Sequence, residues 1–438
     1  MPGILLAIAY AALLLFWMRR MPFFAQVPGL SMRTIAALFT LKILAGTALW
    51  AVYTWVYPDR ATADIFKYFD DSAVLYGALW NAPGDFFRML FGIGNDSPYF
   101  TEQYYAVMNN WIRQFENNVY NDSHTMIRFN AVLRLFSFGY YHVHTVFACF
   151  LSTAGLVALY RALVPLVKGM ERGLMVAVFL WPSMLFWASG VLKESLLVFG
   201  LGFFLLGMTG PWNFAKRWRA VLAIAIGTCT MLVVKFYVLL CLIPGLLAWW
   251  WWRSNKRGAL WKSIVVHVAA VILALVSGTL FPGYDVLYLL AMKQSDFIGM
   301  ATEVKSGSLM VVPTLEPTLW SFVQNIPSAL YLTFLSPFAA MGNGLMGLMS
   351  GLENLALLSL PFLAVRYACP RAAINVPVLL FVFSFALLLA LLIGWTVPVV
   401  GALVRYRIPM LPFLSFAVLL MIDPQRLPRW LLNNRSNH

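Results

Sequence analysis

The chain has 438 residues, of which 61% are hydrophobic and only 11% are charged. A soluble globular protein carries about 25% charged residues, so this composition excludes a soluble fold and predicts an all-α polytopic membrane protein. The net charge of +14 indicates attraction to anionic membrane lipids, because most basic residues lie in short loops between apolar runs; nucleic acid is not expected as a partner.

Apolar runs of about 20 residues recur along the whole chain, and each is long enough to cross the hydrocarbon core as a helix. Two pairs of neighbouring runs nearly touch and are predicted to form tight hairpins. The eleven predicted spans are Gly3 to Met18, Thr34 to Tyr57, His142 to Leu163, Gly173 to Gly190, Val191 to Met208, Ala220 to Val234, Val238 to Trp252, Ser263 to Phe281, Leu345 to Val365, Val376 to Trp395 and Pro409 to Ile422.

Every second loop is basic, which predicts the orientation because lysine and arginine favour cytoplasmic loops. The N-terminus is therefore expected outside and the C-terminus inside, in a single multi-pass domain (residues 1–438) of the cytoplasmic (inner) membrane. The first span lacks a basic leader and is expected to be a retained helix. The basic residues are Arg19, Arg20, Arg33, Lys168, Arg172, Lys216, Arg217, Arg219, Arg253, Lys256, Arg257, Lys262, Arg366, Arg371, Arg426, Arg429 and Arg435.

More than half of the acids fall in one predicted outer loop, residues 58–141, which we call the acidic loop. Its many aromatic residues predict a segment folded on the membrane surface, with an interfacial helix over Ser72 to Leu90. A second outer segment, residues 282–344, is expected to pack beside it and roof a cavity facing the periplasm. The acids of the loop are Asp59, Asp64, Asp70, Asp71, Asp85, Asp96, Glu102, Glu116 and Asp122.

Three aspartates, Asp64, Asp70 and Asp71, lie within the stretch ADIFKYFDDSAVLY. One interpretation makes them solvated residues at a helix start, with Asp71 or Ser72 as the N-cap. The other makes one of them a catalytic base, because a carboxylate at the membrane boundary has an easily raised pKa. The sequence leaves both open.

Lys193 and Glu194 follow the stretch WPSMLFWASGVL and stand between two apolar runs. Ionisable groups at that depth cost about 2 to 3 kcal/mol each unless they pair, snorkel or line a wet cavity. They form either a local pair in a snorkelling turn or part of a site, and we favour the site.

Arg405, Tyr406 and Arg407 lie on the outer side directly before the last span, against the usual charge bias. Planar guanidinium groups suit a phosphate or pyrophosphate at that depth, and Lys235 is a third outward cation. The alternative is pairing with acidic-loop aspartates or lipid headgroups.

Other motifs carry less chemistry. The four cysteines have no paired spacing, and His142 with His144 is interpreted as an interfacial pair. Glu353 stands in the middle of a predicted span; it is expected to hydrogen-bond a neighbouring helix through the small-residue face of Gly347, Ser350 and Gly351, or else to reach the cavity.

Taken together, the stretches DIFKYFDDS, PSMLFWASGVLKES and RYRIPMLPF resemble the integral-membrane C-type glycosyltransferases (the GT-C superfold), over about Thr34 to Ile422. The resemblance implies many helices around a cavity, a polyprenyl-phosphate-linked sugar donor and a lipid or glycan acceptor. It departs in one respect: the acidic loop follows the second span rather than the first, so that Gly3 to Met18 would be an added helix.

Carried over, the resemblance assigns proton abstraction from the acceptor to Asp64, Asp70 or Asp71, with inversion at the sugar. Arg405, Arg407 and Lys235 would hold the leaving phosphate. A divalent metal such as Mg²⁺ or Mn²⁺ is left open. The alternative function is a polysaccharide polymerase or ligase, or a flippase-like carrier of lipid-linked saccharides.

Overall fold

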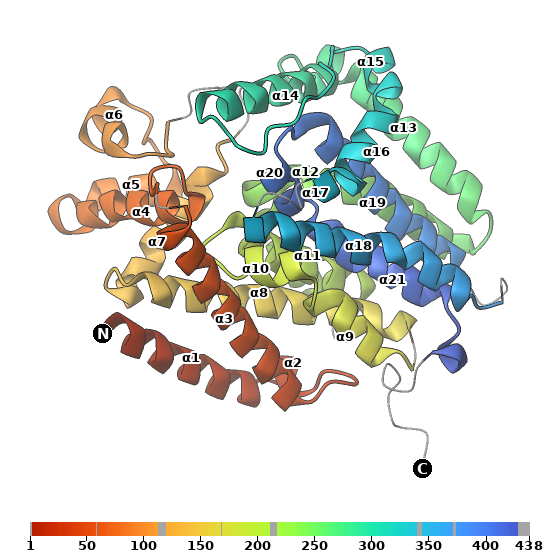
Figure 1. Cartoon of the computed structure of the whole chain (residues 1–438). Coiled ribbons are helices and arrows are strands. Elements are labelled where there is room, and N and C mark those ends of the chain that lie inside the picture. Colours follow the sequence, from red (N-terminus) through yellow and green to blue (C-terminus); the bar gives the residue numbers. More distant parts are fainter. Residues whose placement is uncertain are drawn as a thin grey trace. The chain divides into compact units, whose positions relative to one another are not determined.

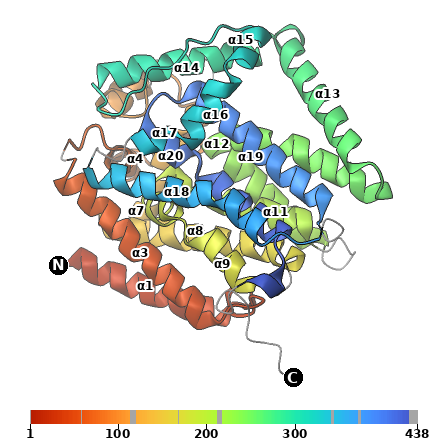
Figure 2. The same cartoon turned by 45° about the vertical axis from the view of Figure 1, so that its right-hand side comes forward.

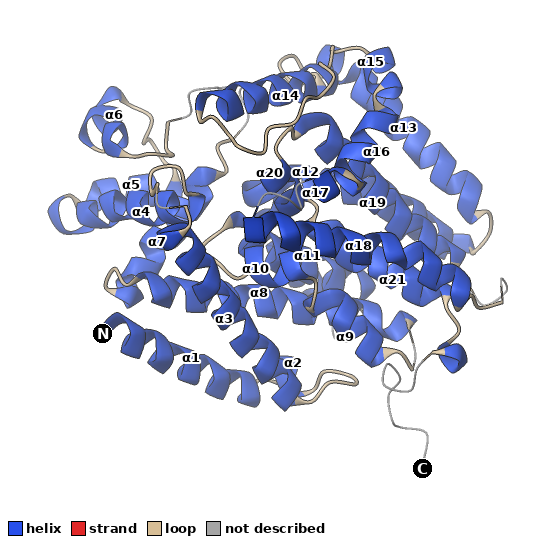
Figure 3. Ribbon diagram, in the orientation of Figure 1, coloured by secondary structure: helices blue, strands red, loops and turns tan. Residues whose placement is uncertain are grey.

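The computed structural model describes residues 2–57, 59–112, 120–167, 169–210, 217–339, 344–370 and 374–427. About 80% of the chain is helical, and the described ranges contain no strand, only two isolated bridges (Figure 3). The expected all-α membrane fold is confirmed at this level. Six of the charged residues named above lie outside the described residues, as does Pro58 at the start of the acidic loop; they are Glu116, Lys168, Lys216, Arg371, Arg429 and Arg435.

Eight helical segments of the described chain are long and apolar enough to cross a membrane. They make the chain a multi-pass membrane protein. The segments are α1 (Pro2–Arg20), α3 (Met32–Trp55), α8 (Tyr141–Leu163) with its extension to Leu166, α12 (Arg217–Asn255), α13 (Ala259–Leu280), α18 (Gly344–Arg366), α19 (Val376–Thr396) and the run Val400–Met421, which holds α20 (Val400–Tyr406) and α21 (Leu411–Met421).

Four predicted spans differ in detail. The span expected over Gly173 to Gly190 is two helices, α9 (Glu171–Phe179) and α10 (Pro182–Trp187), because Pro182 has no N–H to continue a helix and restricts the residue before it. The next span is α11 (Lys193–Thr209), of 17 residues. The expected hairpin around Lys235 is a single non-helical residue inside α12, with φ −154° and ψ 78°.

The chain divides into two compact units. Unit 1 holds residues 1–162 and 184–236, and unit 2 holds residues 163–183 and 237–438. Unit 1 therefore contains the acidic loop, α11 and the first part of α12, whereas unit 2 contains α13 to α21.

In unit 1, α1 and α3 meet at the short α2 (Pro22–Ala25), drawn in red in Figure 1. The acidic loop folds into α4 (Asp64–Asn81), α5 (Pro83–Phe91), α6 (Pro98–Gln103) and α7 (Ser123–Ser137), and α4 packs on α5 and α7. The predicted cap at Asp71 or Ser72 is wrong, because α4 begins at Asp64 and runs through both residues. The predicted helix Ser72 to Leu90 is also divided, since α4 ends before Pro83.

In unit 2, the segment after α13 folds into α14 (Val286–Glu303), α15 (Leu319–Gln324), α16 (Ile326–Phe334) and α17 (Ser336–Ala339). Helix α19 is the centre of this unit and contacts α13, α14, α16 and α21. Figure 2 labels α19 together with α13, α14 and α16. Its side chains Phe385, Leu389 and Ile393 are fully buried. Packing of residues 282–344 beside the acidic loop stays a prediction.

Glycines let the membrane helices of unit 1 approach closely. A Cβ on Gly202 of α11 would lie 1.9 Å from the Gly155 carbonyl oxygen of α8, and one on Gly227 of α12 would lie 2.5 Å from the Phe204 nitrogen. Such contacts between backbones are typical of helix packing in membranes, where close van der Waals contact stabilises the bundle.

We therefore expect Gly202→Ala to lower the stability of the protein by about 1 to 3 kcal/mol, because backbone atoms cannot give way to the new methyl group. The matched control is Gly77→Ala in α4, where nothing lies within 4 Å of the added carbon. That control is expected to be neutral or stabilising by about 0.5 to 1 kcal/mol. Thermal unfolding in detergent compares them; equal melting temperatures would contradict the packing argument.

Candidate functional site

Asp70 and Asp71 are adjacent in α4 but have different surroundings. Asp70 accepts two hydrogen bonds from the Arg60 guanidinium, at 2.7 and 2.6 Å, on a partly exposed surface. Asp71 is buried and accepts hydrogen bonds from the backbone N–H groups of Asn109 and Asn110, both at 2.8 Å. Asp71 thus anchors the part of the acidic loop that follows α6.

Burial raises the pKa of the Asp71 carboxyl above its ordinary value, although the amide hydrogen bonds from Asn109 and Asn110 act in the opposite direction. A base needs an accessible lone pair aimed at the substrate. Both Asp71 oxygens are already used by backbone donors, so the geometry gives Asp71 a structural role in the acidic loop.

Asp64 is the first residue of α4 and is half-buried. A carboxylate in the first turn is stabilised by the helix dipole. Tyr68 follows one turn later, on the same side of the helix. Asp64 therefore shares a helix face with Tyr68. The Tyr68 ring contacts Lys193, which belongs to the predicted Lys193–Glu194 motif.

Lys193 at the start of α11 joins that motif to the acidic loop. Its Nζ lies 2.9 Å from Asp122 Oδ1, donates to Ser123 Oγ at 3.2 Å, and lies 5.2 Å from the centroid of the Tyr68 ring. Within unit 1 this contact joins Lys193 to the acidic loop through Asp122, an acid other than the three predicted as the base. Sequence reasoning counted Asp122 among the loop acids but did not select it, because its partner is 71 positions further along the chain.

Glu194 and Lys235 form a buried ion pair in unit 1, with Nζ 2.9 Å from Oε1 and side-chain exposures of 0% and 3%. The non-helical backbone at Lys235 interrupts α12, and Thr125 of α7 donates to the Val233 carbonyl nearby, at 2.6 Å. The two ions of the motif therefore each have a long-range partner. The Lys235 ammonium is directed to Glu194 within the protein.

Arg407 is fully buried in unit 2 and belongs to a network with α18. Its guanidinium donates to Glu353 Oε1 at 2.9 Å and to Asn354 Oδ1 at 2.7 Å. Glu353 also accepts from the N–H and hydroxyl of Ser183, at 2.6 and 2.7 Å. The structural interpretation of Glu353 is supported, with Ser183 and Arg407 as partners in place of the small-residue face.

Arg405 and Tyr406, at the end of α20, are half-buried. The Tyr406 ring lies 6.2 Å from that of Tyr237 and 5.9 Å from that of Phe297, all in unit 2. Because Asp64 and Lys193 belong to unit 1, the meeting of these groups in one cavity stays a prediction.

His144 lies in a hydrogen-bond chain with the order of a Ser-His-Asn triad. Its Nε2 lies 2.7 Å from Ser137 Oγ, and its Nδ1 lies 2.7 Å from Asn130 Oδ1. All three side chains are 0% exposed, so no substrate reaches the Ser137 hydroxyl. The chain is a buried link between α7 and α8, and His144 is a core residue instead of an interfacial one.

The described acids and histidines do not gather into a metal site. The described ranges hold no group of three or more His, Cys, Asp or Glu side chains that could bind a metal ion. The carboxylates of Asp70 and Asp71 are bonded to a guanidinium and to amides, respectively. These surroundings do not fit a cation, and no chemical step is assigned to one.

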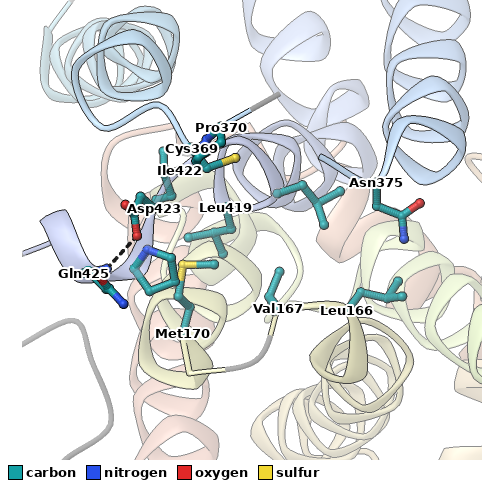
Figure 4. Close-up of a pocket in the computed structure, with 12 residues that line it drawn as sticks. Leu166, Val167, Met170, Cys369, Pro370, Asn375, Leu419, Ile422, Asp423 and Gln425 are labelled. Carbon is teal, nitrogen blue, oxygen red and sulfur yellow. Dashed lines mark hydrogen bonds between the residues drawn. The ribbon is translucent and has the colours of Figure 1, made fainter. Parts of the chain in front are cut away.

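A cavity of about 320 Å³ opens in unit 2 near the end of α21 (Figure 4). Its lining combines apolar side chains such as Met170 and Leu419 with polar ones such as Asn375 and Asp423, which accepts from the Gln425 N–H at 3.0 Å. None of the predicted site residues lines it.

Neither the known protein families, nor curated protein sequences, nor solved structures include a match to this chain.

Proposed function

We propose that this protein is a membrane glycosyltransferase that moves a sugar from a polyprenyl-phosphate donor to a hydroxyl group of a lipid or glycan acceptor, at the outer face of the cytoplasmic membrane. The observation that carries the proposal is the contact of Lys193 with Asp122 and Tyr68. Through it, the acidic loop and the Lys193–Glu194 motif form one charged cluster beside membrane helices.

In the proposed reaction Asp64 is the base. Its carboxylate takes the proton of the acceptor hydroxyl while the hydroxyl oxygen attacks the anomeric carbon. The phosphate is on the opposite face of the sugar from the attacking oxygen. The bond between the anomeric carbon and the phosphate oxygen breaks, and its electron pair leaves with polyprenyl phosphate. The single displacement inverts the configuration of the sugar.

The departing phosphate needs positive charge. Arg405 is the proposed ligand, because a half-buried guanidinium can donate two hydrogen bonds to phosphate oxygens. Arg407 and Lys235 are each buried against a glutamate, so they are assigned structural roles around the site instead of contact with the phosphate. Lys193, beside Asp122, is proposed to bind polar groups of the substrate.

Incubation of the purified protein with a set of polyprenyl-phosphate sugars and candidate acceptors tests the function. We expect release of polyprenyl phosphate together with a glycosylated product of inverted anomeric configuration. Joining of preassembled lipid-linked oligosaccharides, or their movement across vesicle membranes without bond cleavage, would instead favour the polymerase or carrier.

The proposed sidedness is tested separately. In a background with the exposed Cys229 replaced, Ser97→Cys in the acidic loop is expected to react with a membrane-impermeant maleimide applied from the periplasmic side. Ser254→Cys, beside the basic turn after α12, is the matched control and should react only after permeabilisation. The reverse pattern would overturn the orientation.

A further inference from the structure

The segment between α10 and α11, residues 188–192, is irregular and fully buried. It leads directly into Lys193 and Glu194. At membrane depth, backbone groups outside a helix must find partners inside the protein, because no water is present to bind them. The residues that bind this segment therefore determine the positions of Lys193 and Glu194.

Two side chains from other helices of unit 1 bind this region. Lys42, in the middle of α3, donates from Nζ to the Met184 carbonyl at 3.2 Å. Cys149 of α8 donates from Sγ to the Ser189 carbonyl at 3.0 Å. Ser195, in the first turn of α11, donates to the Gly190 carbonyl at 2.8 Å.

The backbone of α3 also contacts the segment directly. A Cβ on Gly46, one turn after Lys42, would lie 2.2 Å from the Ser189 carbonyl oxygen. The α3 helix thus places the Lys42 donor at Met184 and the bare backbone of Gly46 at Ser189. Lys42 and Gly46 are four positions apart in α3, and their two partners are five positions apart in the sequence. The fit holds α10 and the segment after it against one face of α3.

Lys42 is 0% exposed, and the hydrogen bond that it makes goes to a neutral carbonyl. An ammonium in a membrane helix is costly, and a methionine would fill a similar volume without that cost. Met184 lies in the last turn of α10, where the carbonyls lack helix partners and attract a cation. We therefore interpret Lys42 as a residue that holds the end of α10 in place.

We propose that Lys42 is a positioning residue of the site: by holding the end of α10, it fixes residues 188–192 and so the first turn of α11, where Lys193 meets Asp122 and Glu194 meets Lys235. Its effect on turnover rests on the proposed glycosyltransferase function. Its effect on the backbone of the segment does not.

The test compares Lys42→Met with Lys262→Met. Lys262 is a matched control because it is also buried and donates to a carbonyl, that of Trp251 at 3.1 Å, but lies in unit 2. Amide hydrogen exchange of the peptide covering residues 188–195 is measured in the full-length protein, together with turnover, donor affinity and melting temperature.

We expect Lys42→Met to speed exchange of this peptide by about tenfold or more, because a charge-assisted hydrogen bond is lost. Turnover should fall by about tenfold or more, because Lys193 and the Glu194–Lys235 pair are misplaced. Lys42→Arg should restore part of the slow exchange and part of the turnover. Lys262→Met should change neither the exchange of this peptide nor the turnover. Cys149→Ala, a smaller change, should speed exchange less.

Unchanged exchange and turnover in Lys42→Met would overturn the proposal, as would equal losses in both lysine variants that follow their melting temperatures. If no protein, wild type included, transfers a sugar, the proposed function fails. The exchange data would still decide whether Lys42 holds the segment.

Discussion

Replacement of Asp64 by Asn is expected to reduce turnover by about 10²-fold to 10⁴-fold while donor affinity stays nearly unchanged. The amide keeps the size and hydrogen-bonding shape of the side chain but cannot accept the acceptor's proton. Asp64 is the carboxylate in the first turn of α4, and α3 ends at Trp55, before it in the chain. It is also one turn from Tyr68, over which the Lys193 ammonium lies.

Two neighbouring aspartates serve as controls for this prediction. Asp70→Asn removes a partly exposed pair with Arg60, whose contribution is about 1 kcal/mol or less, so turnover should change little. Asp71→Asn places an NH₂ group against one of two backbone donors and should lower stability instead. Turnover and donor affinity are measured side by side. Full turnover in Asp64→Asn with loss in Asp70→Asn would move the base to Asp70.

The fold class could be predicted because it depends on composition and on apolar run length. Eight long apolar helices of the described chain match that expectation. Helix ends were harder, because local signals compete. Asp71 and Ser72 look like an N-cap in sequence, yet the apolar pattern of Ile65, Phe66 and Phe69 buries the preceding turn and extends α4 back to Asp64.

The site could be predicted only in part, for a physical reason. A buried ion marks its own position in a sequence, because it interrupts an apolar run, and so Lys193, Glu194 and Glu353 could be selected. Its partner carries no such mark. Asp122 is one acid among nine in the acidic loop, and Ser183 looks like an ordinary helix start. Only folding brings each to its ion.

Lys42 is a second case in which the sequence shows a buried ion but not its partner. A lysine inside a predicted span is visible in sequence, but its partner is a backbone carbonyl, which every residue possesses. No pattern of residue types could identify Met184. The contact with Ser189 through Gly46 is equally hidden, since it depends on a missing side chain.

The second large effect is expected at Glu353 and Arg407. Both side chains are essentially unexposed, with Nη2 2.9 Å from Oε1, so removal of one partner leaves an uncompensated charge in the interior. Glu353→Gln and Arg407→Met should each destabilise the protein by about 3 to 5 kcal/mol. The control is Glu102→Gln in the exposed part of the acidic loop, which should leave the melting temperature unchanged.

The double variant Glu353→Gln with Arg407→Met separates a structural pair from a catalytic one. If the two ions act on each other, the double variant should lose much less stability than the sum of the single losses, because no unpaired charge remains. Glu353 then holds α18 to Ser183 and Arg407, and turnover should follow the folded fraction in all variants. Thermal unfolding and turnover are measured on the same preparations. A Glu353→Gln protein that melts like the wild type but transfers no sugar would place this glutamate in the chemistry instead, as the cavity interpretation of the sequence allowed.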